Sequence, residues 1–156
     1  MTSKPHSIRF KVIRPVYETL TIKENVPDYF NPKQRLTDPS AIWEMFKFLG
    51  RETKEYFYTL HLDNKNRIIC IDLVSVGSLS QSIVHPREVF KSSLLSSAAA
   101  IILIHNHPTG DTTPSREDLE ITRRLKEAGD LLGIRILDHL IVAESDYTSL
   151  SAQGII

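Results

Sequence analysis

The alternation of hydrophobic and polar residues predicts regular structure from about residue 38 onward. Helical spacing over "DPSAIWEMFKFLG" predicts a helix that Asp38 caps, that Pro39 begins and that Gly50 ends. Two β-rich runs, 55–63 and 67–77, flank a short Asn/Lys turn, a pattern typical of a β-hairpin. A further short strand is expected over 81–84.

The second half of the chain predicts alternating helices and strands. The stretch "HPREVFKSSLL" predicts a helix with Val89, Phe90 and Leu94 on its buried side. The continuous apolar run "AAAIILI" is typical of a central strand buried on both faces. A helix over 115–132, a strand over 134–142 and a closing edge over 146–156 follow. The predicted fold class is therefore α/β (α+β), with a mixed, largely antiparallel sheet packed between helices.

The first 34 residues are less regular than the rest. They contain four prolines and one short alternating piece, Val16 to Ile22, that favours a strand. We interpret 1–34 as an N-terminal arm or edge hairpin in front of a single domain over 35–156.

Composition and charge narrow the classes of function. The 156 residues are 41% hydrophobic and 24% charged, with 19 basic and 19 acidic residues. A net charge of zero gives no electrostatic reason to expect a nucleic-acid or membrane partner. The single cysteine, Cys70, excludes an intrachain disulfide. Without a long apolar segment or a signal-like N-terminus, we expect a cytoplasmic protein.

The polar stretch "HNHPTGDTTPSREDL" contains candidate metal ligands. His105 and His107 are two residues apart at the end of the predicted central strand, so their side chains share one face and Asn106 points to the other. If Ser115 caps the next helix, Asp118 falls on the apolar stripe that faces the sheet. Two imidazoles and an inward carboxylate make a plausible three-ligand site with a fourth position for water.

Simpler interpretations exist for the same residues. Ser115 and Asp118 have the spacing of a capping box, in which the carboxylate returns to the helix N-terminus. A histidine at the end of a strand is usually an ordinary hydrogen-bonded polar residue. The conjunction of His105, His107 and an inward Asp118 around a proline-bounded loop favours the metal site.

The same stretch resembles the JAMM signature of the MPN/JAB metalloproteases, which is His-x-His, seven residues, Ser, two residues, Asp. Further segments, including "VHPREVFKSSL", "LLGIRILDHLIV" and "YTSL", resemble the RadC-type branch of that family. The resemblance implies an MPN/JAB, cytidine-deaminase-like architecture. It also implies a hydrolase that binds one Zn²⁺ through His105, His107 and Asp118.

The resemblance also assigns roles to other residues. The family requires an upstream glutamate, and the resemblance matches it to Glu55. The residues alone could not choose Glu55 over Glu52. Glu55 would move protons as general base and acid, and Ser115 would donate to the tetrahedral oxyanion. His139 and Asp111 are expected at most in a supporting layer around the metal.

The expected reaction is hydrolysis of an amide, with a protein or peptide substrate. Two alternatives stay open. One is a DNA-associated RadC-type protein, acting in repair or as a metal-dependent nuclease, and the other is a non-catalytic MPN scaffold. A nucleic-acid partner is disfavoured because acidic and basic residues interleave on the helix that follows the motif.

Overall fold

The computed structural model describes residues 9–19, 35–36, 38–77 and 84–156. These residues form α1 (Pro39–Phe46), a 3₁₀ turn η1 (Lys47–Arg51), β1 (Glu55–Leu62), β2 (Ile68–Gly77), α2 (Pro86–Leu95), β3 (Ala100–Asn106), α3 (Arg116–Leu132), β4 (Arg135–Val142) and β5 (Tyr147–Ser149). None of the described helices is long and apolar enough to cross a bilayer.

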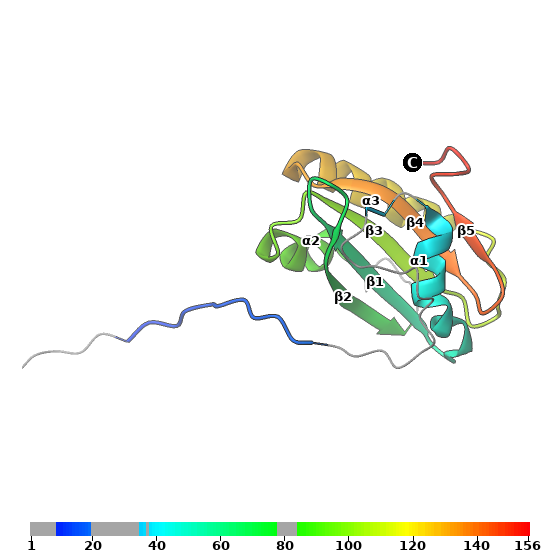
Figure 1. Ribbon diagram of the computed structural model, residues 1–156, viewed down its shortest axis with the longest axis horizontal. Coiled ribbons are helices and arrows are strands. Elements are labelled where there is room, and N and C mark those ends of the chain that lie inside the picture. Colours follow the sequence, from blue (N-terminus) through cyan, green and yellow to red (C-terminus); the bar gives the residue numbers. More distant parts are fainter. Residues whose placement is uncertain (1–8, 20–34, 37, 78–83) are drawn as a thin grey trace, which may run out of the picture.

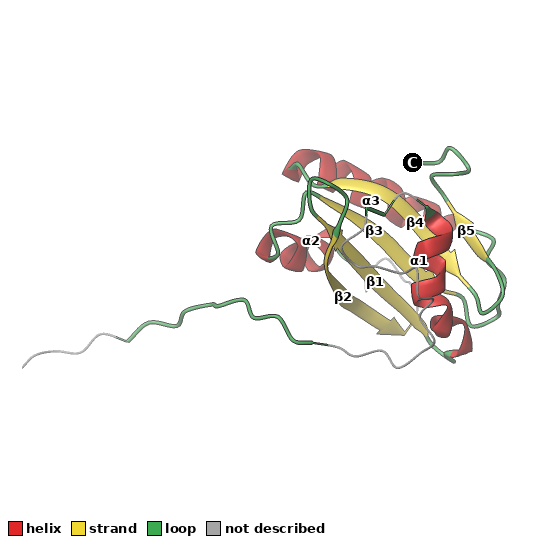
Figure 2. Cartoon of the chain, viewed as in Figure 1, coloured by secondary structure: helices red, strands yellow, loops and turns green. Residues whose placement is uncertain are grey.

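The strands form one five-stranded sheet in the order β2-β1-β3-β4-β5 (Figure 2). β1 runs antiparallel to both β2 and β3, and β5 runs antiparallel to β4. Among the strand pairs of the described residues, only β3 and β4 are parallel, and α3 connects them. The predicted mixed, largely antiparallel sheet is confirmed, and its central strand β3 is buried along its whole length.

Helices cover both faces of the sheet, as the pattern predicted (Figure 1). Odd-numbered residues of β3, such as Ile101 and Leu103, pack with α2 and α3. Even-numbered residues, such as Ile102 and Ile104, pack with α1 and η1. His105 continues the odd series, so its ring faces the layer that contains α3.

The first helix ends earlier than its pattern predicted. The α-helical part stops at Phe46 and continues as the 3₁₀ turn to Arg51. Gly50 lies against the turn after β4, where an added Cβ would come 2.0 Å from the backbone nitrogen of Glu144. Trp43 donates its indole N–H to the carbonyl of Ala143 at 2.9 Å. The tight turn therefore brings the chain into contact with the β4–β5 connection.

Other local predictions have different outcomes. In α2 it is Ser93 that is buried beside Val89 and Phe90, whereas Leu94 is 54% exposed, so its predicted burial is wrong. The strand predicted from Val16 is not formed over 16–19, where the extended chain runs away from the domain without a pairing partner (Figure 1). Its residues 20–22, and residues 81–83 of the other short strand, lie outside the described residues.

Candidate metal centre

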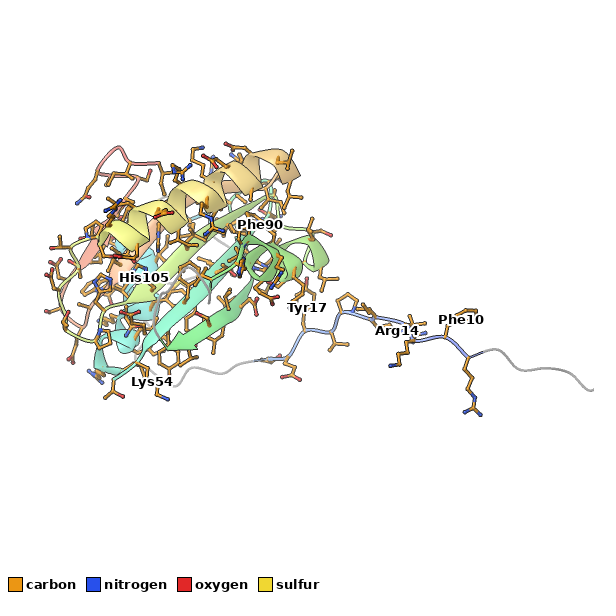
Figure 3. All side chains as sticks on the ribbon, turned by 180° about the vertical axis from the view of Figure 1, so that it is seen from behind. Phe10, Arg14, Tyr17, Lys54, Phe90 and His105 are labelled. Carbon is orange, nitrogen blue, oxygen red and sulfur yellow. The ribbon has the colours of Figure 1, made fainter. Side chains whose placement is uncertain are left out.

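Two histidines lie side by side where β3 ends. His105 is fully buried and His107 is 15% exposed, and their Nε2 atoms are 3.0 Å apart. β1 pairs Phe57 with His105, and the two rings stack at 6.1 Å between centroids. Figure 3 shows His105 beneath the N-terminal end of α3.

The first turn of α3 brings a carboxylate to the same point. Asp118 is 1% exposed, with Oδ1 3.1 Å from His105 Nε2 and Oδ2 3.2 Å from His107 Nε2. Asp118 Oδ2 also accepts from the backbone N–H of Ser115 at 2.7 Å, while Ser115 Oγ accepts from the N–H of Asp118 at 3.1 Å. The capping box and the inward carboxylate are thus both present. One carboxylate satisfies the helix end and still faces the histidines.

The donor atoms of these three residues suit a divalent cation. Ligands about 2.0–2.1 Å from a tetrahedral zinc ion are separated from each other by about 3.3 Å. Here the two Nε2 atoms are 3.0 Å apart, and one ligand atom from each of the three residues lies within 4.8 Å of the others. Asp118 Oδ1 is buried and makes no hydrogen bond with any described residue. Such an atom is costly to bury unless a cation compensates it. His105, His107 and Asp118 could therefore bind a metal ion.

The neutral form of His107 presents a lone pair to this point. Its Nδ1 lies 2.7 Å from the backbone oxygen of Asp111, and because a carbonyl only accepts, Nδ1 must carry the proton. Nε2 is then unprotonated and faces the other two ligands. Asp111, expected in a supporting role, contacts the site through its backbone oxygen, and its exposed carboxylate accepts instead from the N–H of Thr113.

The pKa shifts agree with a site that attracts positive charge. Burial would raise the pKa of Asp118, but the contacts with His105 and His107 outweigh it and hold this pKa well below its usual range. Burial lowers the pKa of His105, whereas the contact with Asp118 raises that of His107. Asp118 is therefore ionised and His105 neutral, and His107 is where a proton binds when no metal is present.

Glu55 begins β1 on the same side of the sheet as the two histidines. It precedes Phe57 by two residues, so in the register that joins Phe57 to His105 it stands at the level of His107. Its side chain is half-buried, and its charge contributes to raising the pKa of His107. The alternation expected from the sequence therefore brings Glu55 to the edge of this site.

The sequence interpretation missed the part played by Asn106. This buried residue points to the opposite face, as expected, and holds the backbone on both sides of Glu55. Its Oδ1 accepts from the N–H of Tyr56 at 2.7 Å, and its Nδ2 donates to the carbonyl of Lys54 at 2.9 Å. The middle residue of His-x-His thus fixes the start of β1. No local sequence signal connects residues 50 positions apart.

His139 and Thr122 extend the polar cluster below His105. The Nε2 atom of His139 lies 2.7 Å from His105 Nδ1, and its Nδ1 lies 2.6 Å from Thr122 Oγ1. All three residues are buried. The sequence interpretation expected His139 at most in a supporting layer, and it did not single out Thr122, which lies one turn after Asp118 on the buried face of α3.

Comparison with known families gives the wider context for this site. Residues 36–155 match the RadC-like JAB domain. The chain belongs to this family. The resemblance drawn from the motif is thereby confirmed, and the sheet and helices described above are consistent with a JAB/MPN fold.

Curated relatives of this RadC-like JAB domain protein are bacterial and archaeal. It is 58% identical over 127 residues to a UPF0758 protein of Geotalea uraniireducens and 56% identical over 124 residues to one of Geobacter sulfurreducens. A UPF0758 protein of Methanosarcina mazei is 49% identical over 126 residues. These alignments cover 79–81% of this chain and 54–56% of each relative, and the shared name states no activity. The chain thus spans about half the length of the relatives it matches.

Proposed function

We propose that this RadC-like JAB domain is a zinc-dependent hydrolase of amide bonds, of the metallopeptidase or isopeptidase type. One observation carries the proposal. The Nε2 atoms of His105 and His107 are 3.0 Å apart and face the two oxygens of the buried Asp118 carboxylate at 3.1 and 3.2 Å. None of these atoms carries a proton when both histidines are neutral and protonated at Nδ1 and Asp118 is ionised. A bound cation would compensate all of these acceptors together, and this supports the proposal.

His105, His107 and Asp118 would hold the ion. Zinc bound by three protein ligands lowers the pKa of a coordinated water to about 7 and polarises a carbonyl. The remaining steps belong to side chains of this chain. The His107 side chain is 15% exposed, so a substrate would reach the site from its side, while His105 and Asp118 stay buried.

Glu55 is the proposed proton carrier. It lies at the level of His107 on a strand whose backbone Asn106 fixes on both sides. As a carboxylate it accepts a proton from the attacking water and later delivers that proton to the leaving amine. A rigid backbone at this position keeps the carboxylate within reach of both groups.

Ser115 is the proposed oxyanion donor. Its Oγ accepts from the backbone of Asp118, and acceptance uses a lone pair but not the hydroxyl hydrogen. That hydrogen is available to donate to the oxygen on which negative charge develops. Capping the helix and stabilising the oxyanion are therefore compatible roles for one hydroxyl.

The charges of α3 give less support to a nucleic-acid function. Arg123 pairs with Glu127 at 2.7 Å, and Lys126 pairs with Asp130 at 3.6 Å. Pairs of this kind, four residues apart on one helix, neutralise each other along a solvated face. These acidic partners reduce the positive potential that a phosphate backbone would meet on this face.

The test combines metal analysis with cleavage assays. The purified protein is stripped with chelator, reloaded with Zn²⁺, and incubated with a fluorogenic peptide library, an isopeptide-linked substrate and DNA. We expect amide cleavage that requires zinc, with about one zinc per chain. Glu55→Gln should retain zinc and lose at least about 100-fold in rate. DNA cleavage alone, or amide cleavage that chelator does not affect, would refute the proposal.

A further inference from the structure

Two residues beneath the metal centre, Thr122 and His139, connect two of the candidate ligands through a series of hydrogen bonds. Thr122 Oγ1 donates to the backbone carbonyl of Asp118 at 2.6 Å and lies 2.6 Å from His139 Nδ1. His139 Nε2 in turn lies 2.7 Å from His105 Nδ1. This series of hydrogen bonds therefore begins at one candidate ligand, Asp118, and ends at another, His105.

In each hydrogen bond of this series, only one of the two groups can be the donor. A carbonyl oxygen accepts and never donates, so the single hydroxyl hydrogen of Thr122 is used on Asp118. Thr122 Oγ1 must then accept from His139, which places a proton on His139 Nδ1. The backbone of α3 thus decides which nitrogen of His139 is protonated.

The tautomer of His139 in turn determines the tautomer of His105. The ring of His139 is fully buried, and both its nitrogens contact groups that carry no negative charge, so the ring is neutral. With its proton on Nδ1, His139 has only a lone pair on Nε2. It must accept from His105 Nδ1–H, which leaves His105 Nε2 without a proton and facing Asp118 and His107.

We propose that Thr122 and His139 are positioning residues that lock His105 in the tautomer able to bind the metal through Nε2. The benefit of this lock, by which we mean the hydrogen bonds that set the tautomer of His105, rests on the proposed function. The hydrogen bonds themselves do not, because they are present before any metal binds. The hydrogen bonds that set this tautomer run from His105 through His139 and Thr122 to the backbone carbonyl of Asp118, a second candidate ligand. Metal binding then needs no tautomer change at His105.

The first test measures zinc affinity by competition with a chromophoric chelator. Thr122→Val removes the hydroxyl with little change in volume, whereas Thr122→Ser keeps it. Loss of such a supporting contact should weaken zinc binding about 10–100-fold in Thr122→Val, while Thr122→Ser stays within about threefold of the wild type. An affinity of Thr122→Val within about threefold of the wild type would overturn the inference.

A matched control comes from the middle of β1, further along the strand from Glu55 than Phe57. Thr59 is also buried, and its Oγ1 lies 2.9 Å from the Nε2 of a buried histidine, His61. Thr59→Val therefore removes the same kind of contact away from the metal centre. Zinc affinity in this variant should equal that of the wild type. An equal loss in Thr59→Val and Thr122→Val would mean a general effect on the fold and would overturn the lock.

The second test reads the tautomer directly in metal-free wild-type protein. The ¹⁵N chemical shifts of His105 and His139 should show both rings protonated at Nδ1 and bare at Nε2. His105 protonated mainly at Nε2 would refute the inference, even if Thr122→Val fails to fold. A wild type that shows the predicted tautomers but binds no zinc would contradict the proposed function and leave the lock intact.

Discussion

Asn106 and Tyr56 are joined across two strands, with Asn106 Oδ1 accepting the backbone N–H of Tyr56 at 2.7 Å. Together with the bond from Asn106 Nδ2 to Lys54, this contact fixes the residues on either side of Glu55. The residue between the two candidate ligands thus positions the proposed proton carrier, and the metal centre and Glu55 are built as one unit.

Replacing Asn106 should separate catalysis from metal binding. Asn106→Leu leaves the N–H of Tyr56 and the carbonyl of Lys54 unsatisfied, which should cost about 1–3 kcal/mol of stability. Hydrolysis should fall about 10–100-fold through kcat, because a displaced Glu55 moves protons poorly. Zinc affinity should stay near the wild-type value, since His105 and His107 keep their contacts. Parallel loss of zinc and activity would contradict a separate role for Asn106.

Replacing the two members of the capping box should affect different properties, zinc affinity for Asp118 and stability for Ser115. Asp118→Asn keeps an oxygen for the N–H of Ser115 but removes the charge, so zinc affinity should fall at least about 100-fold with the helix cap preserved. Ser115→Ala removes the side-chain acceptor and should cost about 0.5–2 kcal/mol of stability while zinc binding persists. Urea unfolding and chelator competition measure the two effects. A loss of zinc in Ser115→Ala equal to that in Asp118→Asn would contradict this division.

The metal-free protein should lose stability in mild acid. Burial lowers the pKa of His61, His105 and His139 from the ordinary value of 6.5. Below that value the unfolded chain binds protons that the folded chain does not, so the free energy of unfolding falls as pH falls. The contact with Asp118 raises the pKa of His107, whose opposite contribution is complete below 6.5 and is lost as pH rises through its folded pKa.

Urea unfolding in the presence of EDTA measures this balance. Three lowered pKa values against one raised value predict a net loss of about 1–3 kcal/mol between pH 7.5 and pH 5. His61→Gln, away from the metal centre, should reduce the dependence of the free energy of unfolding on pH, because it removes one of the three histidines whose pKa is lowered. A midpoint that is constant, or that rises on acidification, would contradict the predicted balance.

Gly50 should tolerate no side chain. An alanine Cβ would lie 2.0 Å from the Glu144 nitrogen and 2.6 Å from the Ala143 carbonyl carbon, both backbone atoms that cannot move aside as a side chain would. Gly50→Ala should therefore lower stability by about 2–4 kcal/mol by forcing η1 away from the end of β4. Thermal unfolding checks this. Gly154→Ala is unsuitable as a control because its φ of +72° would strain an added Cβ. Ser97 also has a positive φ, of 55°, but it already carries a Cβ, so Ser97→Ala removes only an exposed hydroxyl outside this contact.

Local pattern was sufficient for most of the helices and strands after residue 38 and for the grouping of the three candidate ligands. The apolar run over 98–104 fixes β3, and the period of two puts His105 and His107 on one face. Helical spacing from Ser115 turns Asp118 inward. Each of these conclusions depends on residues close in the chain, whose relation is set by backbone geometry alone.

Contacts between distant segments were beyond the sequence pattern. Asn106 and Thr122 are ordinary polar residues until β1 and β4 are placed on either side of β3. The early end of α1 likewise follows from the approach of Gly50 to Glu144, which local spacing does not contain.

The sequence by itself determined most of the elements, the family and the three candidate ligands, because helix and strand periods translate spacing directly into direction. Only the tertiary structure decided which groups surround those ligands and where their protons lie. Hydrogen-bond direction depends on partners that pack together from separate strands and helices. No spacing along the chain specifies such partners.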